Sequence, residues 1–542
     1  MNPRPSLCFR EEDRPACCAS VGFVVLVGTL LLSLGCKRSP DVSDPPTQQR
    51  DGRARTQVSD ELLHHAIDAL YRQEEFDSGE MIQRTMDRLD QWVREQQPIP
   101  GWKPDPMIAT LPDSLRELPV VADLGKLEFR RSDGAYFQEA VWLRDLSNWA
   151  RGEDVEDVAR ATSLFDWTVR NVQLEWDRAA GPAGTRIMQM PWETLLLGHG
   201  TAMERAWAFI LLARQQGIDA VLLGLPASDG SADEAVQPWL VGVLSEEEFH
   251  LFDPELGLPI PGPDGIGLDD DGRFLVKPAT LSQVIADASL LQHLDLDEGH
   301  PYRVEAKQLE GGVVALLEAS PPYLQQRMQM VEARLTGEEK MVLTADPSSQ
   351  AERCRQSEHI AEARLWTHPY ELVQQRTQLG PQAARWQLLS LMPFRVGQSP
   401  SLWKGRISHL KGNFAGEPNA TVYYQLARPS DRELSAADIP RELAEVYQQA
   451  KQSASYWLGL IAYEQGNYRS AVDYLSNRTL EAAENSAWTR GSHYNLGRIY
   501  EADHQYDKAL AEYRTKSPSP DRHGNLLRAR WLERLTANPK DG

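Results

Sequence analysis

The chain has 542 residues, of which 41% are hydrophobic and 25% charged, and its formal net charge is -21. This length exceeds what a single hydrophobic core accommodates, so we expect roughly three or four domains. The acidic balance argues against nucleic acid as a partner, because there is no overall basic field to neutralise phosphates. The sequence predicts no metal site and no cofactor.

The N-terminal region contains a segment typical of export and membrane attachment. Residues 15–36 carry no charge, and they end in the run Leu-Ser-Leu-Gly-Cys at 32–36. This run resembles the lipobox of bacterial lipoproteins, which implies cleavage before Cys36 and lipidation of its thiol. An uncleaved anchor is the alternative, since about 20 apolar residues cross a bilayer. Both interpretations place the protein in the cell envelope, attached to a membrane, with most of the chain outside the cytoplasm.

Five regions follow this segment, which we assign to residues 1–36. Residues 37–57 are rich in Pro, Asp, Gln and Arg and are predicted to be a disordered tether. Apolar residues at helical spacing then predict an N-terminal helical segment at 58–116. The remaining predicted regions are a helix-and-sheet domain at 117–275, a mixed region at 276–440 and a helical repeat region at 441–542.

The region 117–275 contains a pattern with chemical implications. A helix is expected over about 154–172, and a second helix follows Gly200-Thr201-Ala202 and continues through Ala206 to Gly217. The second segment resembles the nucleophile-bearing helix of the transglutaminase-like superfamily, in which a cysteine begins the helix. The resemblance implies helices packed on an antiparallel sheet, and it aligns the nucleophile position with Ala202.

Three further features follow the order of that family. They are the apolar run 220–223, the run 237–243 and the run 250–254. The resemblance aligns the family's general-base histidine with Gln237 and its orienting aspartate with Asp253. An alanine has no nucleophilic atom and a glutamine does not titrate near neutrality, so two of the three roles are empty. The sequence therefore predicts a non-catalytic domain, in which Gln237, Trp239 and Asp253 are candidates to line a ligand-binding cleft.

Two alternatives to that interpretation remain open. An active amidase or peptidase could use a displaced nucleophile such as Thr201, near His199 and Glu204, although Thr201 also suits the ordinary role of a helix N-cap. Trp239 and Asp253 could equally be a core residue and a turn residue. Cys354, the one cysteine beyond the N-terminal region, lies in a helical pattern and is interpreted as an ordinary thiol.

The region 276–440 carries no chemical motif. Strands are expected over 312–317 and 341–344, a helix over 323–335, and mostly helix from 361 to 391, which together favour a small α/β module followed by helices. The acidic segment 263–272 does not have the spacing of a calcium-binding loop and is expected to form a surface turn.

The region 441–542 contains an internal repeat. Leu458-Gly459 is followed by Tyr468 and Ala471, and the same four residue types recur 38 positions later. The pattern resembles tetratricopeptide repeats, in which small residues let two antiparallel helices approach closely. The resemblance implies a surface for a protein or peptide partner. Taken together, the sequence predicts a multidomain α+β protein that acts as an envelope-anchored, non-catalytic scaffold.

Overall fold

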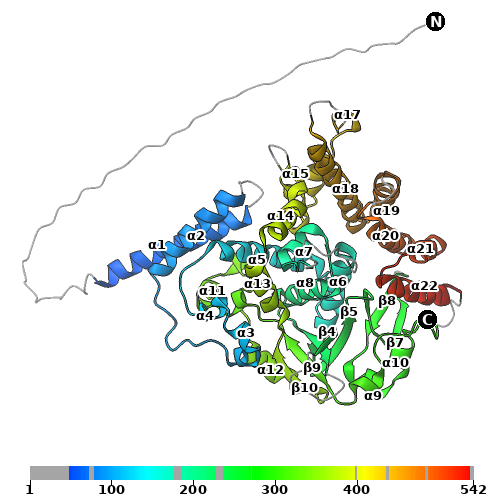
Figure 1. The fold of residues 1–542 in the computed structure, drawn as a ribbon, viewed down its shortest axis with the longest axis horizontal. Coiled ribbons are helices and arrows are strands. Elements are labelled where there is room, and N and C mark those ends of the chain that lie inside the picture. Colours follow the sequence, from blue (N-terminus) through cyan, green and yellow to red (C-terminus); the bar gives the residue numbers. More distant parts are fainter. Residues whose placement is uncertain are drawn as a thin grey trace, which may run out of the picture. The chain divides into compact units, whose positions relative to one another are not determined.

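The computed structural model describes residues 48–72, 78–175, 186–226, 236–269, 272–396, 400–434, 439–482 and 486–537. Contacts divide the chain into two compact units, Met1–Arg55 and Thr56–Gly542. The second unit contains every strand and almost all of the helical residues that the structure describes (Figure 1). Cys36 and the rest of the predicted signal or anchor lie outside the described residues.

The N-terminal helices begin earlier than the sequence predicts. Helix α1 covers Gln48–Tyr71, so a regular helix replaces the predicted tether over 48–57, and α2 covers Ser78–Arg94. Their apolar faces are buried through Leu63, Ile67, Leu89 and Trp92. Three short helical turns follow, at Pro106–Thr110 (η2), Asp113–Arg116 (α3) and Pro119–Ala122 (α4).

Four helices surround the predicted motif. They are α5 (Arg131–Ala150), α6 (Asp157–Asn171), α7 (Pro191–Leu197) and α8 (Ala202–Gln215). Helix α8 is buried on all sides from Glu204 to Ala213, because α5, α6 and α7 pack around it and the sheet covers its remaining face. A helix that is apolar all round belongs in the centre of a domain, and α8 occupies that place.

A mixed sheet of six strands forms the centre of the α+β fold, in the order β10-β9-β3-β4-β5-β6. Its strands are β3 (Asp219–Leu225), β4 (Gln237–Ser245), β5 (Glu248–Asp253), β6 (Leu258–Pro259), β9 (Val313–Leu317) and β10 (Ile360–Leu365). Within this sheet, the β9–β10 pair is parallel and the other described pairs are antiparallel. Two small sheets join β1 (Gln173–Leu174) to β2 (His199–Gly200), and β7 (Pro261–Leu268) to β8 (Phe274–Pro278).

The two faces of the sheet belong to different apolar clusters. Leu222, Val241 and Phe252 lie in the cluster that contains α5–α8, whereas Leu223 and Leu251 lie in a second cluster on the opposite face. This division follows from the strand period of two, which points successive side chains to opposite faces. The second face is covered by α9 (Leu281–Ala286), α10 (Ser289–Gln292), α12 (Pro347–Cys354) and residues of α22 (Asp521–Ala537).

The predictions for 276–440 need two corrections. The expected strand at 313–317 is present, but residues 341–344 form no strand, and 361–365 form the edge strand β10 instead of helix. Ala363 and Leu365 are buried against the sheet, so the tertiary position overrides the local helical pattern. Besides α9, α10 and α12, the described helices of this region are α11 (Gln326–Glu332), α13 (His368–Gln378), α14 (Pro381–Ser390), α15 (Ser401–Leu410), α16 (Ala420–Leu426) and α17 (Asp431–Leu434). Four short 3-10 turns cover Ala306–Leu309 (η4), Pro321–Leu324 (η5), Gly337–Glu339 (η6) and Met392–Phe394 (η7).

The C-terminal region consists of two helical hairpins and a final helix. The first hairpin pairs α18 (Arg441–Glu464) with α19 (Tyr468–Val472) and the π-helical turn η8 (Asp473–Leu480). The second pairs α20 (Thr489–Ala502) with α21 (Tyr506–Tyr513), against which α22 packs.

The 38-residue offset of the sequence is also present in the packing. A Cβ atom on Gly459 would lie 2.6 Å from Leu475, and one on Gly497 would lie 2.4 Å from Tyr513, which is the equivalent neighbour in the second hairpin. The turns correspond as well, since Gly466 (φ 69°) and His504 (φ 56°) both adopt the left-handed conformation. The two hairpins are therefore copies of one structural unit.

Candidate functional site

The predicted nucleophile position lies at the first turn of α8. Ala202 is the first residue of the helix, and Thr201 caps it, because its Oγ1 accepts a hydrogen bond from Glu204 N (3.3 Å). The Glu204 carboxylate accepts in return from Thr201 N (2.8 Å) and from Gln189 N (2.7 Å). These bonds form a capping box, the arrangement typical of a Thr followed three residues later by Glu.

The residues considered for a displaced nucleophile have different partners. The Thr201 hydroxyl oxygen accepts from the helix backbone, whereas His199 Nδ1 lies 3.0 Å from Glu175 Oε2. Glu204 is buried and holds two backbone N–H groups. These contacts give all three residues structural partners.

Asp253 is fully buried, and its carboxylate has four donors. Oδ1 accepts from Glu255 N (2.9 Å) and Leu256 N (3.1 Å), which closes the turn after β5. Oδ2 accepts from the Tyr302 hydroxyl (2.7 Å) and lies 3.1 Å from Arg303 Nη2. A carboxylate offers about four acceptor positions, so that of Asp253 is saturated.

Trp239 belongs to the same group of residues. Its indole Nε1 donates to the Tyr302 hydroxyl (2.9 Å), and its carbonyl accepts from Arg303. Burial raises the pKa of Tyr302 well above its usual value, and the neighbouring Asp253 charge adds to the shift. Tyr302 thus joins the two residues as a neutral phenol, and we call this group of four residues the Asp253 network. No motif indicated Tyr302 or Arg303 in the sequence.

The sheet separates the Asp253 network from α8. Phe252 points toward the helices, where its ring lies 5.5 Å from Phe209 of α8 and 5.2 Å from Phe165 of α6. Asp253 is the next residue on the strand, so its side chain points to the opposite face. Gln237 is exposed at the start of β4. The structure therefore joins Trp239 to Asp253, while Ala202 lies on the helix that covers the other face.

The thiol of Cys354 is also unsuited to act as a nucleophile. Cys354 is completely buried at the end of α12, and burial raises the pKa of its thiol to about 12. A thiol with such a pKa is protonated at neutral pH and is a poor nucleophile.

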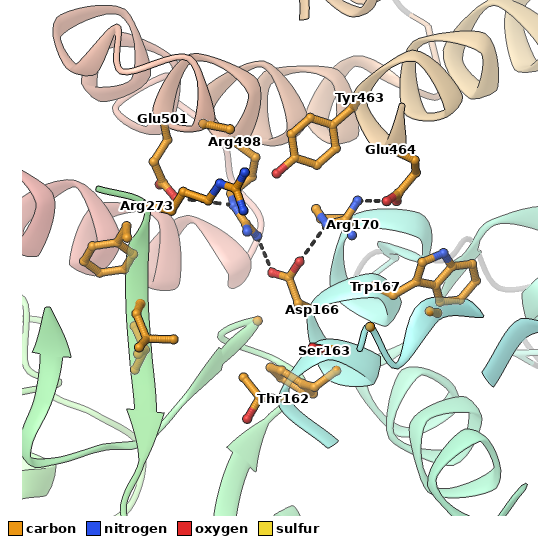
Figure 2. Close-up of a pocket in the computed structure, with 18 of the residues that line it drawn as sticks. Thr162, Ser163, Asp166, Trp167, Arg170, Arg273, Tyr463, Glu464, Arg498 and Glu501 are labelled. Atoms are coloured by element: carbon orange, nitrogen blue, oxygen red, sulfur yellow. Dashed lines mark hydrogen bonds and ion pairs between the residues drawn. The ribbon is translucent and has the colours of Figure 1, made fainter. Parts of the chain in front are cut away.

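A cavity with many charged lining residues lies between α6 and the C-terminal helices. This cavity has a volume of about 530 Å³, and Figure 2 shows a close-up of it. Its walls come from the end of α5, from α6, from the hairpin β7–β8 and from α18, α20 and α22. A volume of this size is in the range of small-molecule sites.

Charged side chains, most of them buried, form one wall of the cavity. Asp166 of α6 lies at its centre and accepts from Arg170 Nε (2.8 Å) and Arg498 Nη1 (2.6 Å), as Figure 2 shows. Arg170 also donates through Nη1 to Glu464 of α18 (2.5 Å). Burial opposes ionisation of Asp166, but the two guanidinium groups outweigh it and hold the pKa of this carboxyl well below its usual range.

A second group of charges continues this wall. Arg528 of α22 donates through Nε (2.8 Å) and Nη2 (2.6 Å) to the carboxylate of Glu501 on α20, which also accepts from the Tyr513 hydroxyl (2.8 Å). Although burial acts against its charge, Glu501 keeps the pKa of Arg528 above its usual value. We call the six residues Asp166, Arg170, Glu464, Arg498, Glu501 and Arg528 the junction network, because they link α6 to the C-terminal helices.

Two polar groups at the cavity have unused hydrogen-bonding capacity. Arg498 is 8% exposed, and its Nε has no hydrogen-bond partner among the described residues, since Glu501 Oε1 lies 3.7 Å away. The hydroxyl of Tyr463 has no hydrogen bond to any described residue and points toward Arg170 and Arg498 in Figure 2. Arg498 Nε is enclosed by protein atoms, but the described hydrogen bonds of Arg498 all use Nη1, so Nη2 and the Tyr463 hydroxyl are the donors available to a ligand atom or water.

Comparison of the chain with protein-family models, with curated proteins and with solved structures found no match. The transglutaminase-like and tetratricopeptide-like resemblances therefore stay predictions. Among the residues that the structure describes, no helix combines the length and the hydropathy of a membrane span.

Proposed function

We propose that this chain is an envelope-anchored, non-catalytic binding protein whose partner is a protein or a peptide. This proposal is supported best by the side chains at the positions where acyl chemistry would need a nucleophile and an orienting carboxylate. Ala202 provides no nucleophile, the Thr201 oxygen accepts from the α8 backbone, and the Asp253 carboxylate is saturated by structural donors on the opposite face of the sheet.

A binding role is supported by the cavity at the junction network. The described residues that line it include charged groups of both signs and aromatic rings. They include no cysteine and no histidine. Such a lining suits recognition of a ligand by charge and shape. The two C-terminal hairpins supply part of this lining, which is consistent with a repeat region that contacts a partner.

The first test is catalytic and uses the full-length chain purified in detergent. Hydrolysis of peptide amides and incorporation of a fluorescent primary amine are measured beside the variants Thr201→Ala and Thr201→Asp. Aspartate is a good N-cap but has no hydroxyl nucleophile, so the second variant separates helix stability from chemistry. We expect no turnover in any of the three proteins. Turnover in the unmodified chain that is lost in Thr201→Asp would contradict the proposal and identify Thr201 as a displaced nucleophile.

The second test concerns attachment to the envelope. If Cys36 is lipidated, the mature protein gains acyl chains and loses the preceding segment, so globomycin should cause a precursor of lower mobility to accumulate. A Cys36→Ala variant should show no such shift. A chain that stays membrane-bound with a mobility insensitive to globomycin would support the uncleaved anchor, and a chain recovered free of membranes would contradict the proposal.

A further inference from the structure

We infer that the cavity at the junction network binds a zwitterionic ligand, namely a short peptide or amino acid with a free ammonium and a free carboxylate group. This inference rests on the proposed binding function and specifies its ligand. The contributing side chains come from α6 and from three C-terminal helices, which lie far apart in the sequence.

The lining of the cavity carries charges of both signs. The cavity is lined by four arginines and four acidic residues, which are Arg170, Arg273, Arg498, Arg528, Asp166, Asp269, Glu464 and Glu501. Their formal charges cancel, so the site offers no net attraction to a ligand of one sign. A ligand that carries both signs can place each charged end beside an opposite charge and leave the balance intact.

Unused donors lie at the cavity. The described hydrogen bonds of Arg498 all use Nη1, and the Tyr463 hydroxyl makes none, so Arg498 Nη2 and this hydroxyl can donate to a carboxylate. Arg498 is held in place by its bond to Asp166 and by a second bond from Nη1 to the Tyr494 hydroxyl (3.1 Å). A guanidinium that is fixed in this way is preorganised for a carboxylate of the ligand.

The Glu464 carboxylate offers an acceptor for the ammonium group of the ligand. The described bond of Glu464 uses Oε1, which accepts from Arg170, and its side chain retains 16% exposure. Its second oxygen can therefore accept from an ammonium group. The Arg170 guanidinium bonds Glu464 and lies 4.9 Å from the Tyr463 ring, so both side chains reach the same part of the cavity, as an amino acid or a dipeptide requires.

Part of the cavity lining is apolar and aromatic. Trp149 and Phe414 pack edge to face at 5.3 Å, and both are partly exposed where they line the cavity. The Trp149 indole donates to Leu410 O (2.9 Å), which fixes the ring. Aromatic surface of this kind favours an apolar side chain of the ligand, and the cavity volume of about 530 Å³ leaves room for it.

The experiment is isothermal titration of the full-length chain in detergent with Ala-Phe, Ala-Leu, Ala-Ala and free phenylalanine. The best binder is then compared with its N-acetylated and its C-terminally amidated derivative. We expect saturable binding that weakens at least about tenfold with either derivative, because each loses a charge-assisted hydrogen bond. If either derivative binds as tightly as the zwitterion, or if none of the four compounds binds, the inference is wrong.

Three variants localise the binding. Ser163→Phe places a ring in the cavity without removing a charge, and we expect it to abolish binding. Tyr463→Phe removes only the hydroxyl and should weaken binding about threefold to tenfold. Tyr447→Phe makes the same change on α18 away from the cavity and should bind as the unmodified chain does. Circular dichroism confirms that each variant is folded, and unaltered binding in folded Ser163→Phe would overturn the inference.

These results are separable from those on the proposed function. Turnover in the catalytic assay would contradict the non-catalytic proposal, while leaving the effects of Ser163→Phe and of the blocked dipeptides to decide the ligand. Absence of dipeptide binding would remove the ligand assignment and leave the catalytic result unaffected.

Discussion

The Asp253 network and the junction network both bury ionised groups, but they differ in how completely those groups are satisfied. In the first, the Asp253 carboxylate has four donors, and Tyr302 both donates and accepts. In the second, which lines a cavity, Arg498 Nη2 and the neighbouring Tyr463 hydroxyl make no described hydrogen bond. A saturated network stabilises a fold, whereas a network with unused donors beside a cavity has the capacity to bind.

The largest change in stability is expected when one charge of the junction network is removed. In Arg528→Ala, the Glu501 carboxylate stays buried without its bidentate partner, and we expect a loss of about 3–5 kcal/mol in the free energy of unfolding. Chemical denaturation measures the change. The double variant Glu501→Gln/Arg528→Met removes both charges and should lose clearly less. An equal loss in both proteins would show that packing, not the unpaired charge, causes the effect.

Glu139 is a buried carboxyl that, unlike Asp166, has no described guanidinium partner. Burial raises the pKa of Glu139 to about 8, and the charges of Glu318 and Glu193 add to the shift against the hydrogen bond from Trp192 N (2.9 Å). The folded pKa lies above the unfolded one, so the stability that protonated Glu139 provides is complete below about pH 4.5 and decreases as pH rises to about 8.

Glu139→Gln should therefore leave stability unchanged at pH 4 and increase it by about 2–4 kcal/mol at pH 8. Denaturation curves at both pH values test this prediction. A gain of the same size at pH 4 would contradict the protonation argument, because Glu139 is neutral there in both the folded and the unfolded chain.

The Asp253 network should respond with a smaller loss. Tyr302→Phe leaves Trp239 Nε1 without its acceptor and Asp253 Oδ2 with one donor fewer, which costs about 1–3 kcal/mol. Dipeptide binding should be unchanged, because Tyr302 does not line the cavity. Impaired binding in a folded Tyr302→Phe protein would show that the two networks are coupled.

The smallest effect is expected at the start of α8. Thr201→Ala removes the side chain that caps the helix and should cost about 1 kcal/mol, whereas Thr201→Asp should cost less. Thermal unfolding of the two variants measures the difference. If both lose the same amount, the capping bond contributes little to stability.

Local patterns predicted much of the fold. The suitability of Thr201 as an N-cap predicted the beginning of α8, the apolar runs predicted β3–β5, and the repeat of Gly459 at Gly497 predicted two equivalent hairpins. In each case the information lies within a few tens of residues. The helical pattern of 361–365 was misleading, because pairing with β9 decides the conformation of β10.

The candidate site could not be predicted in the same way. Asp166 and Arg498 are 332 positions apart, and Arg170 and Glu464 are 294 apart. No spacing rule joins residues over such distances, and single arginines on amphipathic helices are ordinary in sequence. Tyr302 was missed for the same reason, since its partners Trp239 and Asp253 lie on strands that precede it by 63 and 49 residues.

The distribution of the cavity wall along the chain has a consequence for biosynthesis. Its lining begins at Trp149 and ends at Arg528, and the two Nε and Nη2 bonds to Glu501 form only when α22 docks. A chain that lacks α22 has neither Arg528 in this wall nor the bidentate partner of Glu501. The cavity wall is therefore complete only after α22 has been synthesised and has docked.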